Sequence, residues 1–448
     1  MAPTVDLSSI FKAYDIRGES PDPLDADVAR RIGAAFATFA DADRIVVGRD
    51  CRPSSPALSA GFAAGAAESG ASVWDAGEIT SDMVYYIAGA ESVAGAMITA
   101  SHNPPQYNGI KLTLAGARPV GVDSGLEQVR RMAEEGLTPA ERPGTIEVRD
   151  FRGSYVDHLL GLIEPGALKP LRVAVDGGNG MAGVVIESIF AKIAPSIHGI
   201  YLDPDGTFPN HPADPLRPEN LEDLAAHMSQ IDADVGVAFD GDADRAVFVD
   251  DKLQTLSGST TTAMLGAWFL RREPGAAVVH NLITSRAVPE TILRLGGRPV
   301  KTRVGHSYIK GVMAETDAVF GGEHSGHYYF RDNFRADSGM AAMLVLLQAL
   351  SEDGRPLSEM RTEYEPYAQS GEINMTVLDQ AKMMQQVANA FPGADTDWID
   401  GVTLSWPDRW FNLRPSNTEP LLRLNVEAPD SAQVAKLVAE VTKVLEEG

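Results

Sequence analysis

Residues 93–105 read Val-Ala-Gly-Ala-Met-Ile-Thr-Ala-Ser-His-Asn-Pro-Pro, a short apolar run that ends in a polar turn. The run over 93–98 predicts a buried strand. Because the residue before a proline is pushed out of the helical region, Asn103-Pro104 predicts a turn directly after it. The turn presents Ser101 and His102 at the strand end, where a hydroxyl can accept a group covalently. Taken alone, these residues also fit an ordinary turn.

Strands and helices alternate on both sides of this stretch. Strands are predicted over 44–47 and 71–74 with a helix over 56–69 between them, which indicates a mostly parallel α/β sheet. The pattern restarts twice, and the last ~80 residues change to strands followed by an amphipathic helix. We therefore predict an α/β protein with three similar mixed-sheet domains plus a smaller α+β C-terminal domain, bounded as 1–150, 151–251, 252–367 and 368–448.

Composition restricts the function classes. The 448 residues carry a net charge of −24, which disfavours nucleic acid and anionic membranes as partners. No stretch reaches the ~18 apolar residues of a membrane helix, and Met1–Ser20 lacks the pattern of a signal peptide. The single cysteine, Cys51, fits a reducing cytoplasm, so we expect a cytoplasmic protein. An anionic substrate would need a local basic cluster inside a cleft.

An acidic loop, Asp240-Gly-Asp-Ala-Asp-Arg245, follows a predicted strand over 235–239. Asp240, Asp242 and Asp244 can converge on one hard divalent cation, and Mg²⁺ suits three carboxylates that leave room for water or phosphate. An EF-hand would need glycine at the sixth position, where Arg245 stands. The remaining alternative is a solvated acidic turn, which three like charges disfavour.

Two further loops carry polar groups suited to a phosphorylated sugar. In Gly321-Gly-Glu-His-Ser-Gly-His327, alternate residues Glu323, Ser325 and His327 share one side and suit a polyhydroxylated ligand. A zinc site at His324 and His327 would lack a cysteine or third histidine, and a glycine-rich turn stays possible. Arg414-Pro-Ser-Asn-Thr-Glu-Pro420 precedes a predicted strand containing Arg423 and suits phosphate, although it too fits an ordinary turn.

The stretch Gly178-Asn-Gly-Met-Ala-Gly183 matches G-x-G-x-x-G between a predicted strand and a predicted helix from Val184, with Asp203 further along. This pattern is typical of dinucleotide binding, so an NAD-binding oxidoreductase is an alternative class. It would leave the Ser101 turn, the acidic loop and the Arg414 loop unexplained. We therefore interpret the glycines as a tight strand-to-helix turn.

The four loops 99–104, 240–245, 322–327 and 414–420, taken in order, resemble the signatures of the α-D-phosphohexomutase family, and most of all its bacterial phosphomannomutase and phosphoglucomutase members. The resemblance implies four domains around a central cleft and a phosphoserine at Ser101. It implies that Asp240, Asp242 and Asp244, with a phosphoserine oxygen, hold Mg²⁺. It also implies that Glu323, Ser325 and His327 bind sugar hydroxyls, and that the existing phosphate is bound by Arg414, Ser416, Asn417 and Thr418. Further matches to family active-site positions are Tyr14, Arg17, His102, Asn103, Lys111, Arg245 and His306.

The implied reaction interconverts mannose 6-phosphate and mannose 1-phosphate through a phosphoserine enzyme and a hexose 1,6-bisphosphate, which also serves as activator. Lys111 and His327 are the candidate general bases, and Arg245 would offset charge on the transferring group. Phosphoglucomutase or dual activity is the alternative, although the lysine of some dual relatives is absent from Asn281–Arg286. A phosphosugar-binding protein without turnover is a further alternative. We expect a phosphohexose as partner and a monomer or weak dimer.

Overall fold

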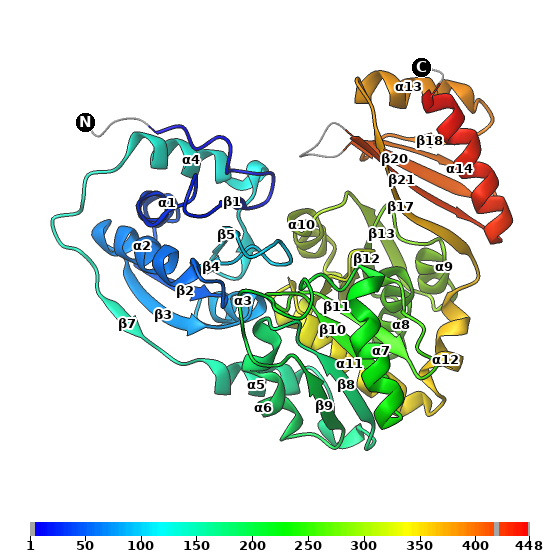
Figure 1. Ribbon diagram of the computed structural model, residues 1–448, viewed down its shortest axis with the longest axis horizontal. Helices are drawn as coiled ribbons and strands as arrows, with labels where there is room; N and C mark the ends of the chain where they lie inside the picture. Colours follow the sequence, from blue (N-terminus) through cyan, green and yellow to red (C-terminus); the bar gives the residue numbers. More distant parts are fainter. Residues whose placement is uncertain (1–4, 416–420, 447–448) are drawn as a thin grey trace.

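The computed structural model describes residues 5–415 and 421–446 and contains four sheets, one in each of four domains (Figure 1). In the view of Figure 1 the first domain lies at the left and the C-terminal domain at the upper right. The second and third domains lie between and below them, and they share a hydrophobic core with one face of the first. Within the described residues, no helix is long and apolar enough to span a bilayer.

The first domain has a mixed sheet in the order β1-β5-β4-β2-β3-β7, with β6 beside β5. Ile45 and Val47 face a core with α1, α2 and α4, while Val46 faces the core shared with the second and third domains. Its strands are β1 (Ile16–Glu19), β2 (Arg44–Arg49), β3 (Ser72–Glu78), β4 (Ala94–Ile98), β5 (Tyr107–Leu114), β6 (Arg118–Pro119) and β7 (Ile146–Val148), and its helices are α1 (Ala26–Phe39), α2 (Ser55–Glu68), α3 (Ser81–Ala90) and α4 (Leu126–Glu135).

The second domain has four strands in the order β11-β10-β8-β9, with only the β10–β11 pair antiparallel. The helix that the sequence predicts from Val184 begins at Ile186, because a 3₁₀ turn over Met181–Val184 precedes it. The strands are β8 (Arg172–Asp176), β9 (Ser196–Ile200), β10 (Val235–Phe239) and β11 (Ala246–Asp250), and the helices are α5 (Arg152–Gly161), α6 (Ile186–Phe190) and α7 (Glu222–Ile231).

The third domain has the sheet order β13-β12-β14-β15-β16, and its helix α11 is buried from Gly339 to Ser351. Because α11 is apolar on all sides, it packs between domains. The strands are β12 (Ala277–Asn281), β13 (Arg298–Thr302), β14 (Phe320–Gly322), β15 (Tyr328–Phe330) and β16 (Ala336–Asp337), and the helices are α8 (Gly258–Arg272), α9 (Ala287–Arg294), α10 (His306–Thr316), α11 (Gly339–Asp353) and α12 (Leu357–Met360).

The fourth domain is an antiparallel sheet, β17-β21-β20-β19-β18, with a hydrophobic core of its own. It joins the third domain through the buried Glu427, which accepts a hydrogen bond from the Arg286 backbone N–H at 3.0 Å. The strands are β17 (Ala368–Thr376), β18 (Asp395–Asp397), β19 (Val402–Ser405), β20 (Trp410–Pro415) and β21 (Leu421–Ala428), and the helices are α13 (Gln380–Ala390) and α14 (Ser431–Glu446).

The predicted α/β class and its four-part division are confirmed, with one difference in the sheets. The sequence predicts mostly parallel pairing, yet β5 pairs antiparallel with both β1 and β4, and β11 pairs antiparallel with β10. β5 follows β4, and β11 follows β10, after a short loop that permits only antiparallel pairing between the two strands. β1 pairs with the other side of β5. The polar loops follow the carboxyl ends of β4, β10 and β14, where α/β folds bind ligands.

We expect His280 on β12 to make folding stability depend on pH. Its side chain is buried, and burial lowers the pKa of its imidazole from 6.5 to about 4. The unfolded chain then binds the proton more readily, so stability is present above pH 6.5 and is lost as the pH falls toward 4. The loss amounts to about 2 kcal/mol between neutral pH and pH ~4.5.

Urea unfolding at several pH values tests this expectation. His280→Gln removes the titrating group, so its unfolding free energy should fall less on acidification than that of the wild type. His198→Gln on β9 is the control, because His198 is only partly buried, and it should keep the wild-type acid sensitivity. Equal slopes for wild type and His280→Gln would contradict the assignment.

Candidate active site

Ser101 sits in the loop between β4 and β5, with its side chain directed at the acidic loop. Its Oγ donates a hydrogen bond to Asp240 Oδ2 at 2.6 Å and lies 3.2 Å from His102 Nδ1. Ser101 adopts a left-handed backbone with φ 52°, which is uncommon for a residue other than glycine. Such strained conformations persist only where the surroundings enforce them, and they concentrate at functional sites.

Arg52 is what enforces the conformation of the Ser101 loop. Its guanidinium is fully buried and is held by Asp50, whose Oδ2 accepts from Nε at 3.0 Å. The remaining N–H groups donate to loop carbonyls: those of Ser101 at 2.7 Å, Asn103 at 2.6 Å, Pro104 at 2.7 Å and Tyr107 at 3.0 Å. Sequence reasoning missed this residue. The stretch Gly48-Arg-Asp-Cys-Arg52 after β2 looks like an ordinary polar strand end.

The acidic loop places oxygens of Asp240, Asp242 and Asp244 within 4.8 Å of one another, and all three side chains are buried. Burial raises the pKa of Asp240 well above its usual range, and the Asp242 and Asp244 carboxylates raise it further. For Asp244 burial acts in the same direction, but the Lys111 ammonium and His327 hold its pKa well below the usual range. Concentrated carboxylates of this kind need a cation beside them.

Lys111 on β5 supplies one such charge. Its Nζ donates to Asp242 Oδ2 at 2.5 Å and to Asp244 Oδ2 at 2.6 Å. Burial alone would lower the pKa of Lys111, but these carboxylates raise it well above its usual range. Asp242 Oδ1, in contrast, is buried and has no hydrogen-bond partner among the described residues. An uncompensated carboxylate oxygen beside two more carboxylates suits a hard divalent cation such as Mg²⁺.

Cationic side chains surround the Ser101 loop on its cleft side. Arg17 Nη1 donates to Asn103 Oδ1 at 2.6 Å, and Arg245 Nε lies 3.6 Å from Asp240 Oδ2. The Arg245 guanidinium and then burial lower the pKa of His102 well below its usual range, which keeps this imidazole neutral. The predicted local basic cluster is therefore present in an otherwise acidic protein, although acidic groups are interleaved with it.

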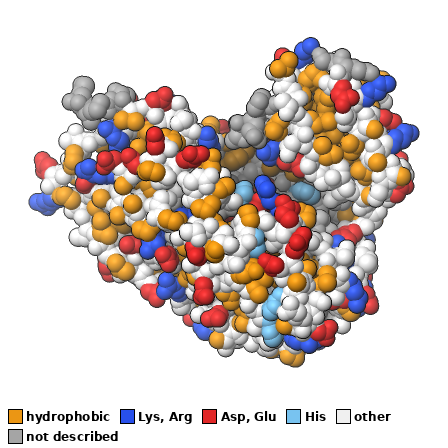
Figure 2. Space-filling view, viewed as in Figure 1, with side chains coloured by type: hydrophobic (Ala, Val, Ile, Leu, Met, Phe, Trp, Pro, Cys, Tyr) orange, Lys and Arg blue, Asp and Glu red, His pale blue; other side chains and the backbone are white. Residues whose placement is uncertain are grey.

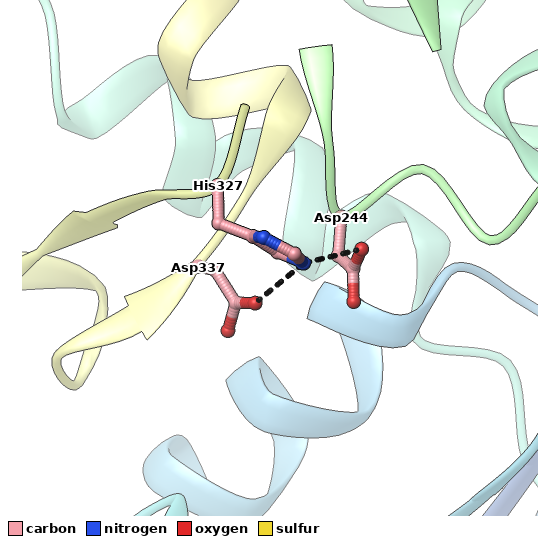
Figure 3. A group of neighbouring side chains, drawn as sticks. All are labelled: Asp244, His327 and Asp337. Atoms are coloured by element: carbon pink, nitrogen blue, oxygen red, sulfur yellow. Dashed lines mark ion pairs between the residues drawn. The ribbon is translucent and has the colours of Figure 1, made fainter. Parts of the chain in front are cut away.

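His327 lies at the centre of the site, between Asp244 and Asp337 (Figure 3). Its Nε2 is 3.5 Å from Asp244 Oδ1 and 4.0 Å from Asp337 Oδ2. Arg245 Nε donates to the same Nε2 at 3.2 Å. Its Nδ1 lies 3.0 Å from Ser325 Oγ, which fixes the orientation of the ring.

Glu323 is more enclosed than the sequence suggests. Only 2% of the residue is exposed, and its carboxylate accepts from Asn281 Nδ2 at 3.2 Å, the Gly305 N–H at 3.1 Å and Tyr329 OH at 2.7 Å. His324, which entered only the disfavoured zinc alternative, belongs to neither group of potential metal ligands among the described residues. Glu323 therefore holds the loop over 321–327 in place and also lines the pocket.

One pocket brings together nine of the nineteen predicted site residues, and Figure 2 shows a hollow with charged side chains and histidine at its floor. Tyr14 reaches it from the first domain, with its OH donating to the Val304 carbonyl at 3.1 Å. The lining also includes residues that the sequence did not single out, Tyr85 and Asp337. The predicted residues in the lining are Tyr14, Arg17, Ser101, Lys111, Asp244, Arg245, Glu323, Ser325 and His327.

Arg414 and Arg423 lie outside that lining, on the sheet of the fourth domain. They are direct neighbours on β20 and β21, and Glu372 on β17 joins them. Arg414 Nη2 donates to Glu372 Oε2 at 2.7 Å, while Arg423 Nη1 lies 3.4 Å from Glu372 Oε1. A carboxylate thus holds two guanidinium groups side by side. The side chain of His306 and residues Ser416, Asn417 and Thr418 fall outside the described part of the chain.

The glycine motif at 178–183 packs against the acidic loop. A Cβ at Gly180 would lie 2.6 Å from the Gly241 carbonyl oxygen, and the Met181 N–H donates to that oxygen at 2.9 Å. The space that a pyrophosphate would need at a dinucleotide site is therefore filled by backbone of this chain. The interpretation of these glycines as a tight turn fits this packing. The motif therefore no longer supports an NAD-binding oxidoreductase.

Comparisons with known proteins agree with this geometry. Family descriptions of phosphoglucomutase/phosphomannomutase match consecutive parts of the chain: alpha/beta/alpha domains I, II and III at residues 8–137, 153–254 and 257–367, and the C-terminal domain at 372–444. The chain belongs to the phosphoglucomutase/phosphomannomutase family, the phosphohexomutases that the four loops resemble.

Similar proteins cover nearly the whole chain. A protein of Xanthomonas campestris pv. campestris described as phosphohexose mutases is 38% identical, with 97% of this chain and 98% of that protein covered. A phosphomannomutase of Salmonella montevideo is 39% identical, with 93% and 94% covered. The crystal structure of a phosphoglucomutase/phosphomannomutase family protein from Burkholderia thailandensis superposes with a TM-score of 0.89 at 32% identity, covering 98% of this chain and 97% of that one.

Proposed function

We propose that the protein is a phosphomannomutase, which interconverts mannose 6-phosphate and mannose 1-phosphate through a phosphorylated Ser101. The observation that carries this proposal is the contact of Ser101 Oγ with Asp240, which joins a serine in a strained loop to the three-carboxylate cluster. Several relatives described as phosphomannomutases, 37–39% identical, support the substrate.

Asp240, Asp242 and Asp244 would hold Mg²⁺, together with an oxygen of phosphorylated Ser101. When bound, the cation stabilises negative charge on phosphoryl oxygens. The buried Asp242 Oδ1, unpartnered within the described residues, supports this assignment. Lys111 then compensates the negative charge of the carboxylates that remains after the cation binds, since its ammonium donates to both Asp242 and Asp244.

In the proposed step, the free 1- or 6-hydroxyl of the sugar attacks the phosphorus on Ser101. The bond from phosphorus to Ser101 Oγ breaks, a bond to the sugar oxygen forms, and the hydroxyl proton passes to His327 Nε2. Between the two candidate bases we assign His327, because its Nε2 acts as an acceptor toward Arg245 Nε, whereas Lys111 donates in its close contacts. The Arg245 N–H must move off Nε2 before this nitrogen can take the proton. Arg245 and Arg17 offset the charge that spreads over the transferring group.

The resulting hexose 1,6-bisphosphate then turns over and returns its other phosphate to Ser101, and the same compound would activate unphosphorylated enzyme. We assign the non-reacting phosphate to Arg414 and Arg423, and the loop residues Ser416, Asn417 and Thr418 are proposed to share it. This assignment requires Glu372 to release or share the two guanidinium groups when the phosphate arrives. This change of orientation requires room in the hollow that lies between the first and fourth domains (Figure 2).

The third domain disfavours dual specificity, because the lysine that some dual-specificity relatives carry is absent there. The stretch Asn281–Arg286 offers no cation to the cleft, because Arg286 Nη2 donates to the Pro407 carbonyl at 2.7 Å.

The test of the proposed function is turnover on mannose 1-phosphate, glucose 1-phosphate and glucosamine 6-phosphate with added Mg²⁺. The largest kcat/KM should be for mannose 1-phosphate, and activity should disappear with EDTA. No turnover on any of them would refute the proposed function.

We expect Arg414→Ala to weaken both directions of the reaction alike. A charge-assisted hydrogen bond contributes about 1.5–3 kcal/mol, so kcat/KM should fall roughly 10- to 150-fold. Arg414→Lys should recover only part, because an ammonium lacks the planar fork. Steady-state kinetics from each isomer provide the measurement.

Arg409→Ala is the matched control. Arg409 precedes β20 at the end opposite Arg414, and its guanidinium lies over the Trp406 ring at 4.9 Å. Its loss should leave kcat/KM unchanged. If Arg414→Ala impaired only one isomer, Arg414 would bind a sugar hydroxyl and not the shared phosphate.

A further inference from the structure

The first turn of α3 lies against the acidic loop, although it belongs to another domain. Ser81 is fully buried there and makes two hydrogen bonds to one residue. Its backbone N–H donates to the Asp242 carbonyl at 3.0 Å, and its Oγ donates to Asp242 Oδ2 at 2.5 Å. Asp242 is therefore fixed at its main chain and its side chain by a single serine.

The two oxygens of the Asp242 carboxylate have different surroundings. Oδ2 accepts from Ser81 Oγ and from Lys111 Nζ, the latter at 2.5 Å. Oδ1 is buried and without a hydrogen-bond partner in the described part of the chain. Rotation of the carboxylate would break both bonds to Oδ2. The contacts therefore hold the carboxylate in the one orientation that leaves Oδ1 free beside Asp240 and Asp244.

Ser81 is itself held rigidly, through its neighbour Asp82. The Asp82 carboxylate is fully buried and accepts from Tyr155 OH at 2.5 Å, from Ser338 Oγ at 2.5 Å and from Thr80 Oγ1. Tyr155 belongs to α5 of the second domain, and Ser338 precedes α11 of the third. The start of α3 is thus fixed to three domains at once, which leaves Ser81 little freedom to move.

We propose that Ser81 is a positioning residue for the divalent cation: it orients Asp242 so that Oδ1 is presented to the metal. This inference rests on the proposed metal site at Asp240, Asp242 and Asp244. Hydrogen bonds that orient a metal-ligating side chain commonly change metal affinity by 10- to 100-fold. Lys111 cannot replace Ser81, since its ammonium is shared with Asp244.

The test measures Mn²⁺ binding to the full, metal-stripped chain by the electron paramagnetic resonance signal of free Mn²⁺, with no substrate present. Ser81→Ala should raise the Kd about 10- to 100-fold. Ser81→Thr keeps the hydroxyl and should bind close to wild type, whereas Ser81→Val, which has the shape of threonine without the hydroxyl, should bind as weakly as Ser81→Ala. This pair also isolates the hydroxyl if Ser81→Ala fails to fold.

Two reference variants separate the possible outcomes. Asp242→Asn should abolish most Mn²⁺ binding, and Ser351→Ala, which removes a buried hydroxyl from α11, should leave the Kd unchanged. Wild-type affinity in Ser81→Ala or Ser81→Val, alongside weakened Asp242→Asn, would overturn the role of Ser81 alone. No Mn²⁺ binding by the wild-type chain would overturn the proposed metal site and this inference with it.

Discussion

Arg52→Ala is expected to destabilise the protein by about 3–5 kcal/mol, because it leaves the buried Asp50 carboxylate without its charge partner. Four loop carbonyls also lose their donors, and each unsatisfied buried acceptor costs about 1–3 kcal/mol unless water replaces the donor. The Ser101 loop would then no longer be held in its left-handed conformation. Turnover should therefore fall together with stability.

Urea unfolding and limited proteolysis measure these effects. Arg52→Lys keeps a positive charge but has three donors in place of the guanidinium fork, so it should still lose stability and expose the loop over 101–107 to cleavage. Arg49→Ala is the control. Its pair with Glu78 is partly exposed, with side-chain exposures of 25% and 42%, and should cost no more than about 1 kcal/mol. Equal losses for Arg49→Ala and Arg52→Ala would contradict the scaffold role.

The contrast between Ser101 and Arg52 shows how far the sequence could predict this site. Ser101 was found because its signal is local: an apolar run, a hydroxyl and an Asn-Pro turn follow one another. Arg52 acts on carbonyls that lie 49 to 55 residues further along the chain. Any sequence with a polar strand end would look the same, so only the pairing of β2 with β4 reveals its role.

The same reason explains the other omissions and differences. Ser81 and Asp242 are 161 positions apart, and Asp82 and Ser338 are 256 apart, so no spacing rule links them. The glycines at 178–183 carried a strong local pattern with the wrong implication, since Gly180 admits the backbone of Gly241 and Gly183 admits that of Leu202. Local periodicity thus predicted which helices and strands form. Sheet order and the contacts between domains depend on residues far apart in the sequence, so local periodicity could not predict them.

Turnover should be lost in Ser101→Ala and Ser101→Gly, while the two variants should differ in stability. Without Oγ the enzyme has no atom to carry the phosphoryl group, so kcat should fall at least about 10³-fold. Glycine at φ 52° relieves a left-handed conformation that costs other residues about 1–2 kcal/mol. Ser101→Gly should therefore unfold at higher urea concentration than Ser101→Ala.

Leu253→Gly serves as the matched control, because Leu253 also has a positive φ, 62°, and is 40% exposed in a turn after β11. It should gain stability in the same direction and keep wild-type turnover, which separates backbone relief from chemistry.

Intact-mass analysis should find one phosphoryl group on part of the wild-type protein and on Leu253→Gly, and none on Ser101→Gly. The route through the bisphosphate requires the enzyme to hold a phosphoryl group at Ser101 between its two transfers. The phosphoserine assignment would therefore be refuted by a Ser101→Gly enzyme that retained turnover or carried stoichiometric phosphate on another residue.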